Sequence, residues 1–182
     1  GFTRVKEGDT ISFGGRTWDV RIGNGHAPEH ATFWSQDDDL VHGGDQLLAT
    51  ISPNLGVYAT EPEADPVGEW LESCRKLIYH ALPEQLVLPG HKLPYKGLPT
   101  RMKQLIPNHH SALERLLEYL DTPRTAVECF PAIFKRKIGE GEYGLALVEA
   151  LAHLKHLYQT GKVTRVRRED DAWLWQVKRE RA

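Results

Sequence analysis

The sequence predicts an α+β protein in which a layered sheet-and-helix part precedes a helical part. Residues 4–97 combine β-like segments of period two with one amphipathic helix, a combination typical of a layered αβ domain. Residues 98–178 read as three helices followed by a β-hairpin, which is the element order of a winged helix. We therefore expect two domains in the 182-residue chain, residues 1–97 and residues 98–182.

The first part begins with a β-meander. Thr10–Phe13 and Thr17–Ile22 flank a Gly14-Gly15 turn, and the second segment alternates in polarity. Ala31–Ser35 and Leu40–His42 follow as two more β segments, joined by the acidic turn 37–39. A solvated turn is the better interpretation of this acidic triplet, because the rest of an EF-hand calcium pattern is absent.

One helix and one strand complete the first part after an irregular stretch at residues 46–64. Asp65 as N-cap and Pro66 at the first helical position predict a helix that runs to Leu82. Its apolar residues recur three or four apart and make one stripe: Trp70, Leu71, Cys74, Leu77, Ile78 and Ala81. Gln85–Leu88 then reads as a short buried strand.

The second part is predicted to be mostly helical. The expected helices are Leu98–Leu120, with Pro107 as a candidate kink, then Arg124–Lys135, then Glu142–Thr160 with Gly161 as its C-cap. Val163–Val166 and Ala172–Val177 are the expected hairpin strands.

Composition limits the classes of protein. Hydrophobic residues make up 40%, which is enough for a packed core, and the net charge of −2 argues against a polycation that binds nucleic acid. No apolar run approaches the length that spans a bilayer, so we expect no membrane association. Cys74 and Cys129 lack CxxC spacing and predict a reducing, cytoplasmic setting, with a disulfide between them as the alternative. Because the chain starts at Gly1 and its only methionine is Met102, we expect a processed product or a fragment.

Three short polar motifs stand beside glycines on turns that follow β segments. They are Gly25-His26 with His30 four residues on, Gly44-Asp45, and Gly90-His91. Imidazole and carboxylate are the ligands that a hydrolytic divalent metal prefers. Glycine allows the sharp backbone that such loops require. These motifs make His26, Asp45 and His91 candidate metal ligands, provided that the fold gathers the three loop ends.

The ordered trio, with helix and strand between its second and third members, resembles the C-terminal half of a metallo-β-lactamase-fold hydrolase with an appended winged helix. The sequence is similar to the glyoxalase-II-like and β-lactamase-like-protein-2 branches of that superfamily. The resemblance implies the C-terminal half of an αββα sandwich over residues 1–96 and a winged helix over residues 100–178. It also implies that His26 is the third metal-binding histidine, Asp45 the metal-bridging and catalytic aspartate, and His91 the last histidine ligand. His30 then lies near the metal without binding it.

The family's first motif, His-x-His-x-Asp-His, is absent from this chain. The resemblance therefore implies a zinc hydrolase that binds two divalent ions when intact, whereas this chain holds a partial metal set or none and is weak or inactive alone. Its expected partners are the missing N-terminal half, a small ester or thioester substrate, and a second copy of the chain. Metal-dependent RNA phosphodiester cleavage is the alternative activity.

A third alternative is an interaction module with a vestigial metal site. The expected helix 142–160 carries one lysine and no arginine, so a scaffolding role is favoured over DNA reading, although Arg165, Arg167 and Arg168 offer backbone contacts. The remaining histidines are expected to be surface or core residues: His42, His80, His109, His110, His153 and His156. Tyr95 is expected to be an amphipathic rim tyrosine.

Overall fold

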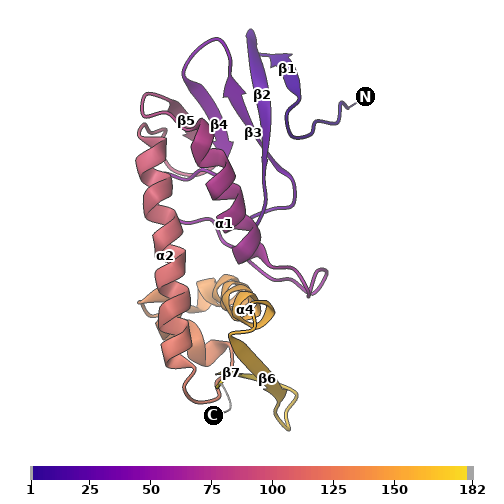
Figure 1. The fold of residues 1–182 in the computed structure, drawn as a ribbon, viewed down its shortest axis with the longest axis vertical. Coiled ribbons are helices and arrows are strands. Elements are labelled where there is room, and N and C mark those ends of the chain that lie inside the picture. The colour runs from indigo at the N-terminus through magenta and orange to yellow at the C-terminus, as the bar shows by residue number, and fades with distance from the viewer. Residues whose placement is uncertain (1, 180–182) are drawn as a thin grey trace. The chain divides into compact units, whose positions relative to one another are not determined.

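The computed structural model describes residues 2–179 and confirms the α+β class (Figure 1). The chain forms two compact units that interleave in sequence. The first unit contains residues up to Pro53 together with Glu69–Ile106, and the second contains Asn54–Gly68 together with residues from Pro107 onward. The division of the chain into two domains at residue 97 stays a prediction.

The first unit is built on a five-stranded sheet in the order β1-β2-β3-β4-β5. The strands are β1 Thr10–Phe13, β2 Arg16–Gly23, β3 His30–Ser35, β4 Leu40–Gly44 and β5 Leu86–Pro89. The first four pair antiparallel as a meander, as the alternating pattern predicted. β5 pairs parallel to β4, with Val41 opposite Val87. The acidic turn 37–39, which joins β3 to β4, binds the start of β2. Asp37 Oδ2 accepts the Thr17 N–H, and Asp38 binds the Arg16 guanidinium.

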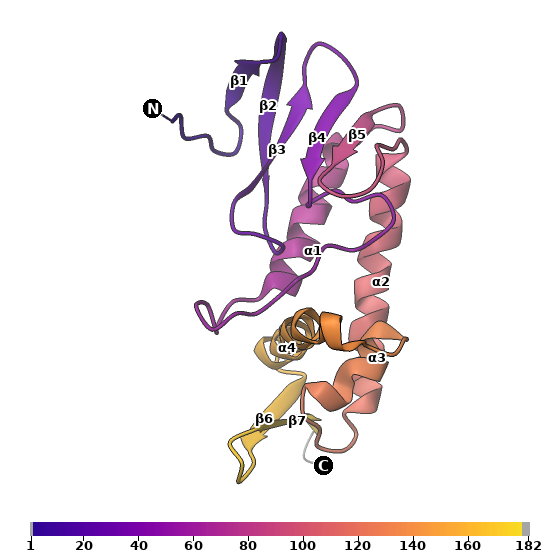
Figure 2. The ribbon, with the colours of Figure 1, turned by 180° about the vertical axis from the view of Figure 1, so that it is seen from behind.

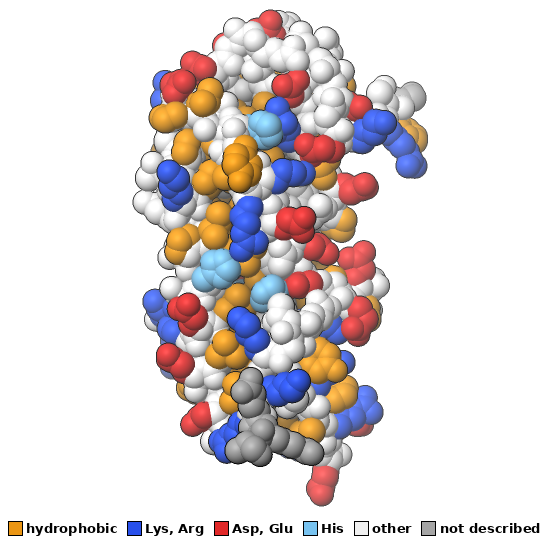
Figure 3. Space-filling view, viewed as in Figure 1, with side chains coloured by type: hydrophobic (Ala, Val, Ile, Leu, Met, Phe, Trp, Pro, Cys, Tyr) orange, Lys and Arg blue, Asp and Glu red, His pale blue; other side chains and the backbone are white. Residues whose placement is uncertain are grey.

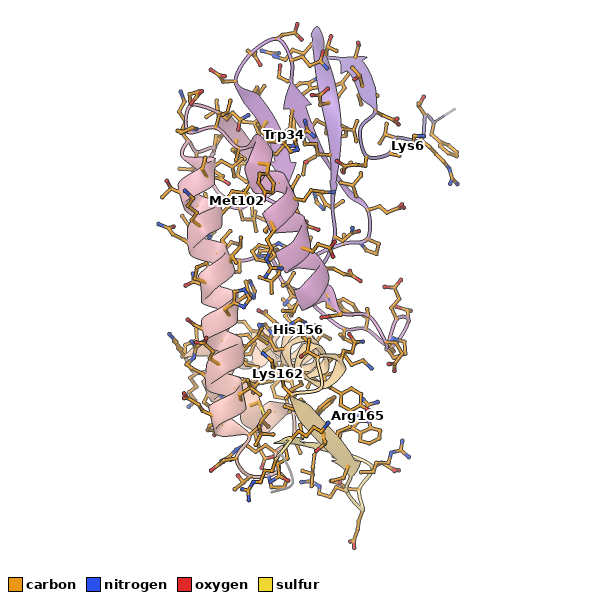
Figure 4. All side chains as sticks on the ribbon, in the orientation of Figure 1. Lys6, Trp34, Met102, His156, Lys162 and Arg165 are labelled. Carbon is orange, nitrogen blue, oxygen red and sulfur yellow. The ribbon has the colours of Figure 1, made fainter. Side chains whose placement is uncertain are left out.

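The two faces of this sheet differ. α1 (Pro66–Leu77) lies along one face, where Trp34, Val41 and Val87 are buried (Figures 1 and 4). The register places Phe13, Phe33 and Leu86 on the opposite face, which no described helix crosses in Figure 2. Phe13 and Leu86 are 42% and 37% exposed, so this second face is apolar and partly open to solvent.

α1 starts as predicted and ends earlier than predicted. Asp65 Oδ1 accepts the Gly68 N–H, which is the expected N-cap bond. The helix stops at Leu77 and continues as a 3₁₀ turn over Ile78–His80, so the predicted end at Leu82 was wrong. Pro83 accounts for this, since a residue before proline is biased towards extended backbone.

Most of the second unit is helical. Its elements are the Pro107–Tyr119 part of α2 (Leu98–Tyr119), the 3₁₀ turn Val127–Cys129, α3 (Phe130–Phe134), the 3₁₀ turn Glu140–Glu142, α4 (Tyr143–Gln159), β6 (Val163–Arg167) and β7 (Trp173–Val177). Helix, helix, helix and hairpin follow in the predicted order, and the winged-helix assignment stays a prediction.

The predicted helix Arg124–Lys135 was wrong in its first half. Arg124 is extended and pairs with Trp175 of β7, exchanging hydrogen bonds of 3.0 Å and 2.7 Å. Its guanidinium also lies over the Tyr119 ring, 4.0 Å from the centroid. These tertiary bonds outweigh the weak local helix preference of a few residues.

Charge and polarity agree with the composition. On the face seen in Figure 3, basic and acidic side chains are interspersed.

Within residues 2–179, no helix is both long and apolar enough to cross a membrane. Cys74 and Cys129 are both buried and free, so the alternative of a disulfide between them was wrong. Burial also raises the pKa of the Cys129 thiol to about 12, and the predicted cytoplasmic setting stays a prediction.

Candidate functional site

The sheet direction explains how three loops reach one place. β2, β4 and β5 run in the same direction, because β3 is antiparallel to both β2 and β4 and β5 is parallel to β4. His26 follows the end of β2, Asp45 the end of β4 and His91 the end of β5. All three loops therefore leave the same edge of the sheet.

At that edge the three predicted side chains converge on one carboxylate oxygen. Asp45 Oδ2 lies 3.3 Å from His26 Nε2 and 3.5 Å from His91 Nε2. Side-chain exposure is 27% for His26, 24% for Asp45 and 65% for His91, so the cluster is open to solvent on the His91 side. The structure thus brings together residues that are up to 65 positions apart, and their role as metal ligands stays a prediction.

Two glycines make room for this cluster. A Cβ at Gly90 would collide with Asp45 Oδ1, and a Cβ at Gly44 would collide with His30 Nε2. Gly44 also has a φ of +49°, a conformation that side chains other than glycine rarely adopt. The glycines beside the candidate ligands are therefore required by close approach as well as by turn geometry.

His30 lies beside the cluster, with its ring centroid 6.2 Å from that of His26, and its role near a metal stays a prediction. Burial lowers the pKa of His30, and the neighbouring His26 lowers it further, so the imidazole is neutral at pH 7. A neutral imidazole can orient a neighbour by hydrogen bonding without adding positive charge to the site.

The donor types fit part of a metal-ligand set. Asp45 Oδ1 is buried and has no hydrogen-bond partner in the described part of the chain, which leaves one carboxylate oxygen to be satisfied. Within residues 2–179, however, no three His, Cys, Asp or Glu side chains are arranged to hold a metal ion by themselves. The cluster thus has the donor types of a metal centre but not a complete coordination shell.

Sequence reasoning missed the side chains that brace these loops. The Tyr95 hydroxyl donates to the Leu47 carbonyl at 3.3 Å, a bond that the sequence did not indicate. Arg101 donates to the carbonyls of Leu48 and Ile51 at 2.9 Å and 3.0 Å. Every residue has a backbone carbonyl that can accept a hydrogen bond, so the amino-acid pattern does not predict such bonds.

The other histidines occupy surface or core positions within their own units, as expected. His42 and His80 are exposed, and His109 and His153 are buried with their rings stacked 5.7 Å apart. His156 of α4, labelled in Figure 4, pairs through Nδ1 with Asp65 at 2.9 Å.

Comparison with known proteins agrees with this architecture. Residues 113–178 match the family described as metallo-beta-lactamase-like, C-terminal domain. A beta-lactamase domain protein from Burkholderia ambifaria superposes over 98% of this chain at a TM-score of 0.91, with 36% identity. These findings support a metallo-β-lactamase-like fold.

Two further relatives agree with that conclusion. A metallo-beta-lactamase family protein from Thermus thermophilus is 29% identical over 96% of the chain, with a TM-score of 0.82. The mitochondrial persulfide dioxygenase ETHE1 of Mus musculus is 32% identical over 92 residues, 50% of this chain. The chain spans 53% and 54% of the two solved structures and 31% of the mouse protein.

Proposed function

We propose that this chain is part of a metal-dependent hydrolase that acts on a small thioester or ester, with zinc as its metal. The observation that carries the proposal is the convergence of two imidazoles on one carboxylate at the ends of three like-directed strands. His26, Asp45 and His91 would hold metal. A bound divalent ion would supply Lewis-acid chemistry, activating water and polarising the bond to be cleaved.

The chain's own residues prepare this chemistry in three ways. The Nε2 atoms of His26 and His91 both lie within 3.5 Å of Asp45 Oδ2, and Asp45 Oδ1 is left for a further partner. His30 packs against Gly44 with its ring 6.2 Å from that of His26, and it would orient the neighbouring imidazole. The exposed side of His91 gives a substrate access to the cluster.

Metal binding by the chain tests this proposal directly. Zinc content and affinity are measured for the wild type and for Asp45→Ala, His26→Ala and the control His42→Ala, whose imidazole is exposed on the open sheet face. We expect the first two variants to lose at least tenfold in zinc affinity and the control to keep it. Equal zinc binding by all four proteins would contradict the assignment of the ligands.

The partly open sheet face suggests what completes the site. It carries the apolar side chains of Phe13, Phe33 and Leu86, and large exposed apolar faces mark places where another element packs. The matched structures are about twice as long as the part that this chain covers. We therefore propose that the rest of the same protein packs there and contributes the missing ligands, with a second copy of the chain as the competing occupant.

Persulfide oxidation is the second candidate activity, because the mouse relative is a persulfide dioxygenase. The two candidates separate by substrate. A complete protein that cleaves small thioesters without consuming oxygen supports the first, whereas oxygen uptake that depends on a persulfide supports the second. Single-stranded RNA is the third substrate in the panel, because RNA cleavage was the alternative activity predicted from the sequence.

A further inference from the structure

The position of His91 relative to Asp45 needs an explanation beyond side-chain packing. At 65% exposure, the His91 side chain has few neighbours that could fix it. It follows Gly90 in a turn where Lys92 has a φ of +72°, an uncommon conformation for a residue other than glycine. The backbone of this turn must therefore be held in place from outside.

Two hydrogen bonds join the His91 loop to the Asp45 loop, one on each side of the candidate ligands. Before the ligands, the Gly90 N–H donates to the Gly44 carbonyl at 2.9 Å. After them, the Tyr95 hydroxyl donates to the Leu47 carbonyl at 3.3 Å. Asp45 and His91 thus both lie between the same two bridging bonds.

Tyr95 is itself anchored where such a bridge requires it. Its backbone exchanges hydrogen bonds with Val87 of β5, at 2.8 Å and 3.1 Å, which closes the turn that contains His91. Burial raises the pKa of the Tyr95 hydroxyl, so the group stays protonated and able to donate at neutral pH.

Arg101 extends the same bracing along the Asp45 loop. Residues 46–51 have no regular secondary structure, so their carbonyls depend on other donors. From the first turn of α2, the Arg101 guanidinium serves two of them, Leu48 and Ile51, at 2.9 Å and 3.0 Å. Arg101 is partly buried, and desolvation lowers its pKa, yet an arginine remains charged at any ordinary pH.

From this geometry we infer that Tyr95 is a positioning residue that sets the separation of His91 and Asp45, and that Arg101 supports it. Only the expected effect of Tyr95 on metal affinity rests on the proposed function. The bracing of the His91 and Asp45 loops by the Tyr95 hydroxyl can be measured without metal.

Tyr95→Phe tests the inference, because it removes the hydroxyl and keeps the ring. Hydrogen exchange of the chain is followed by NMR at the Gly90 and Leu47 amides. The Gly90 N–H donates to the Gly44 carbonyl, and the Leu47 N–H donates to the Gly43 carbonyl. We expect exchange at these amides to accelerate about fivefold, as for the loss of one ordinary hydrogen bond, with the β2 and β3 amides unchanged. Tyr79→Phe, which alters a tyrosine with 86% exposure, is the matched control.

The same variants are then titrated with zinc. We expect Tyr95→Phe to bind zinc three- to tenfold more weakly than both the wild type and Tyr79→Phe while fully folded. If no wild-type chain binds zinc, the proposed function fails and the exchange measurement alone decides the inference. Exchange at Gly90 and Leu47 that matches the control, or that accelerates equally throughout the sheet, would overturn it.

Arg101→Lys provides a second variant in case Tyr95→Phe does not fold. Lysine keeps the positive charge but cannot reproduce the two-carbonyl fork. We expect the same local acceleration of amide exchange near Leu47. Unchanged exchange there would count against the role of Arg101 in bracing this loop.

Discussion

Two buried histidines should make the second unit sensitive to acid. His109 and His153 are 4% and 1% exposed, and the His153 Nδ1–H donates to the Glu149 carbonyl at 2.9 Å. Desolvation is the main cause that lowers the pKa of His109 to about 3 and of His153 to about 4, from an ordinary value of 6.5. Protonation of either imidazole therefore favours the unfolded chain.

The sign and size of the effect follow from linkage. Each folded-state pKa lies below the unfolded value, so this stability is present above pH 6.5 and is lost as the pH falls. The slope approaches about 1.4 kcal/mol per pH unit for each histidine below its unfolded pKa, and the loss between pH 6.5 and pH 5 is about 3 kcal/mol for both. The Glu149 carboxyl opposes this, because burial raises its pKa to about 7 and its neutral form favours the folded state at lower pH. The net loss over this range is then about 1.5 kcal/mol.

Urea denaturation at pH 5, 5.5, 6, 6.5 and 7 measures the effect. His153→Asn keeps a donor for the Glu149 carbonyl and cannot titrate, so between pH 7 and pH 5 its free energy of unfolding should lose about 1 kcal/mol less per pH unit than the wild type. The pKa values of His30 and His80 are also lowered, so the difference between the two slopes is decisive. A slope for His153→Asn equal to that of the wild type, or of the exposed-site control His42→Asn, would refute the reasoning.

Three further predictions concern packing, ion pairing and self-association. Gly90→Ala should cost about 1–3 kcal/mol in unfolding free energy, because its Cβ would displace a carboxylate oxygen, whereas Gly144→Ala has open space and should cost nothing in the same urea assay. Glu63→Gln should lower the urea midpoint more than Lys155→Met, because only the first change leaves the buried Lys155 ammonium without its carboxylate. Leu86→Glu should reduce self-association of the chain in sedimentation, since Leu86 lies on the partly open sheet face, and an unchanged sedimentation profile would argue against that face as a contact surface.

Much of the fold could be predicted from local pattern. Period-two alternation found the meander, and Asp65-Pro66 marked the start of α1, because both signals act within a few residues. The convergence of His26, Asp45 and His91 was predictable only through a resemblance. The spacing of these residues says nothing about strand direction.

The interleaving of the two units could not be predicted in this way. Residues 54–68 join the second unit through polar pairs with α4: Asn54 with Glu149, Glu63 with Lys155, and Asp65 with His156. Each pair joins residues 91 to 95 positions apart, and such long-range bonds leave no periodic trace in the sequence. The same limit explains why Arg124 was expected in a helix.

The parallel pairing of β4 with β5 has a consequence for how the molecule forms. Antiparallel neighbours can zip together from a tight turn, but this pair can meet only after the chain has travelled from Gly44 through α1 to Leu86. Closing so long an excursion costs entropy before the strands can pair, so we expect this step to come late in folding. The edge that gathers His26, Asp45 and His91 would then form late, and a ligand that binds there would stabilise the folded chain.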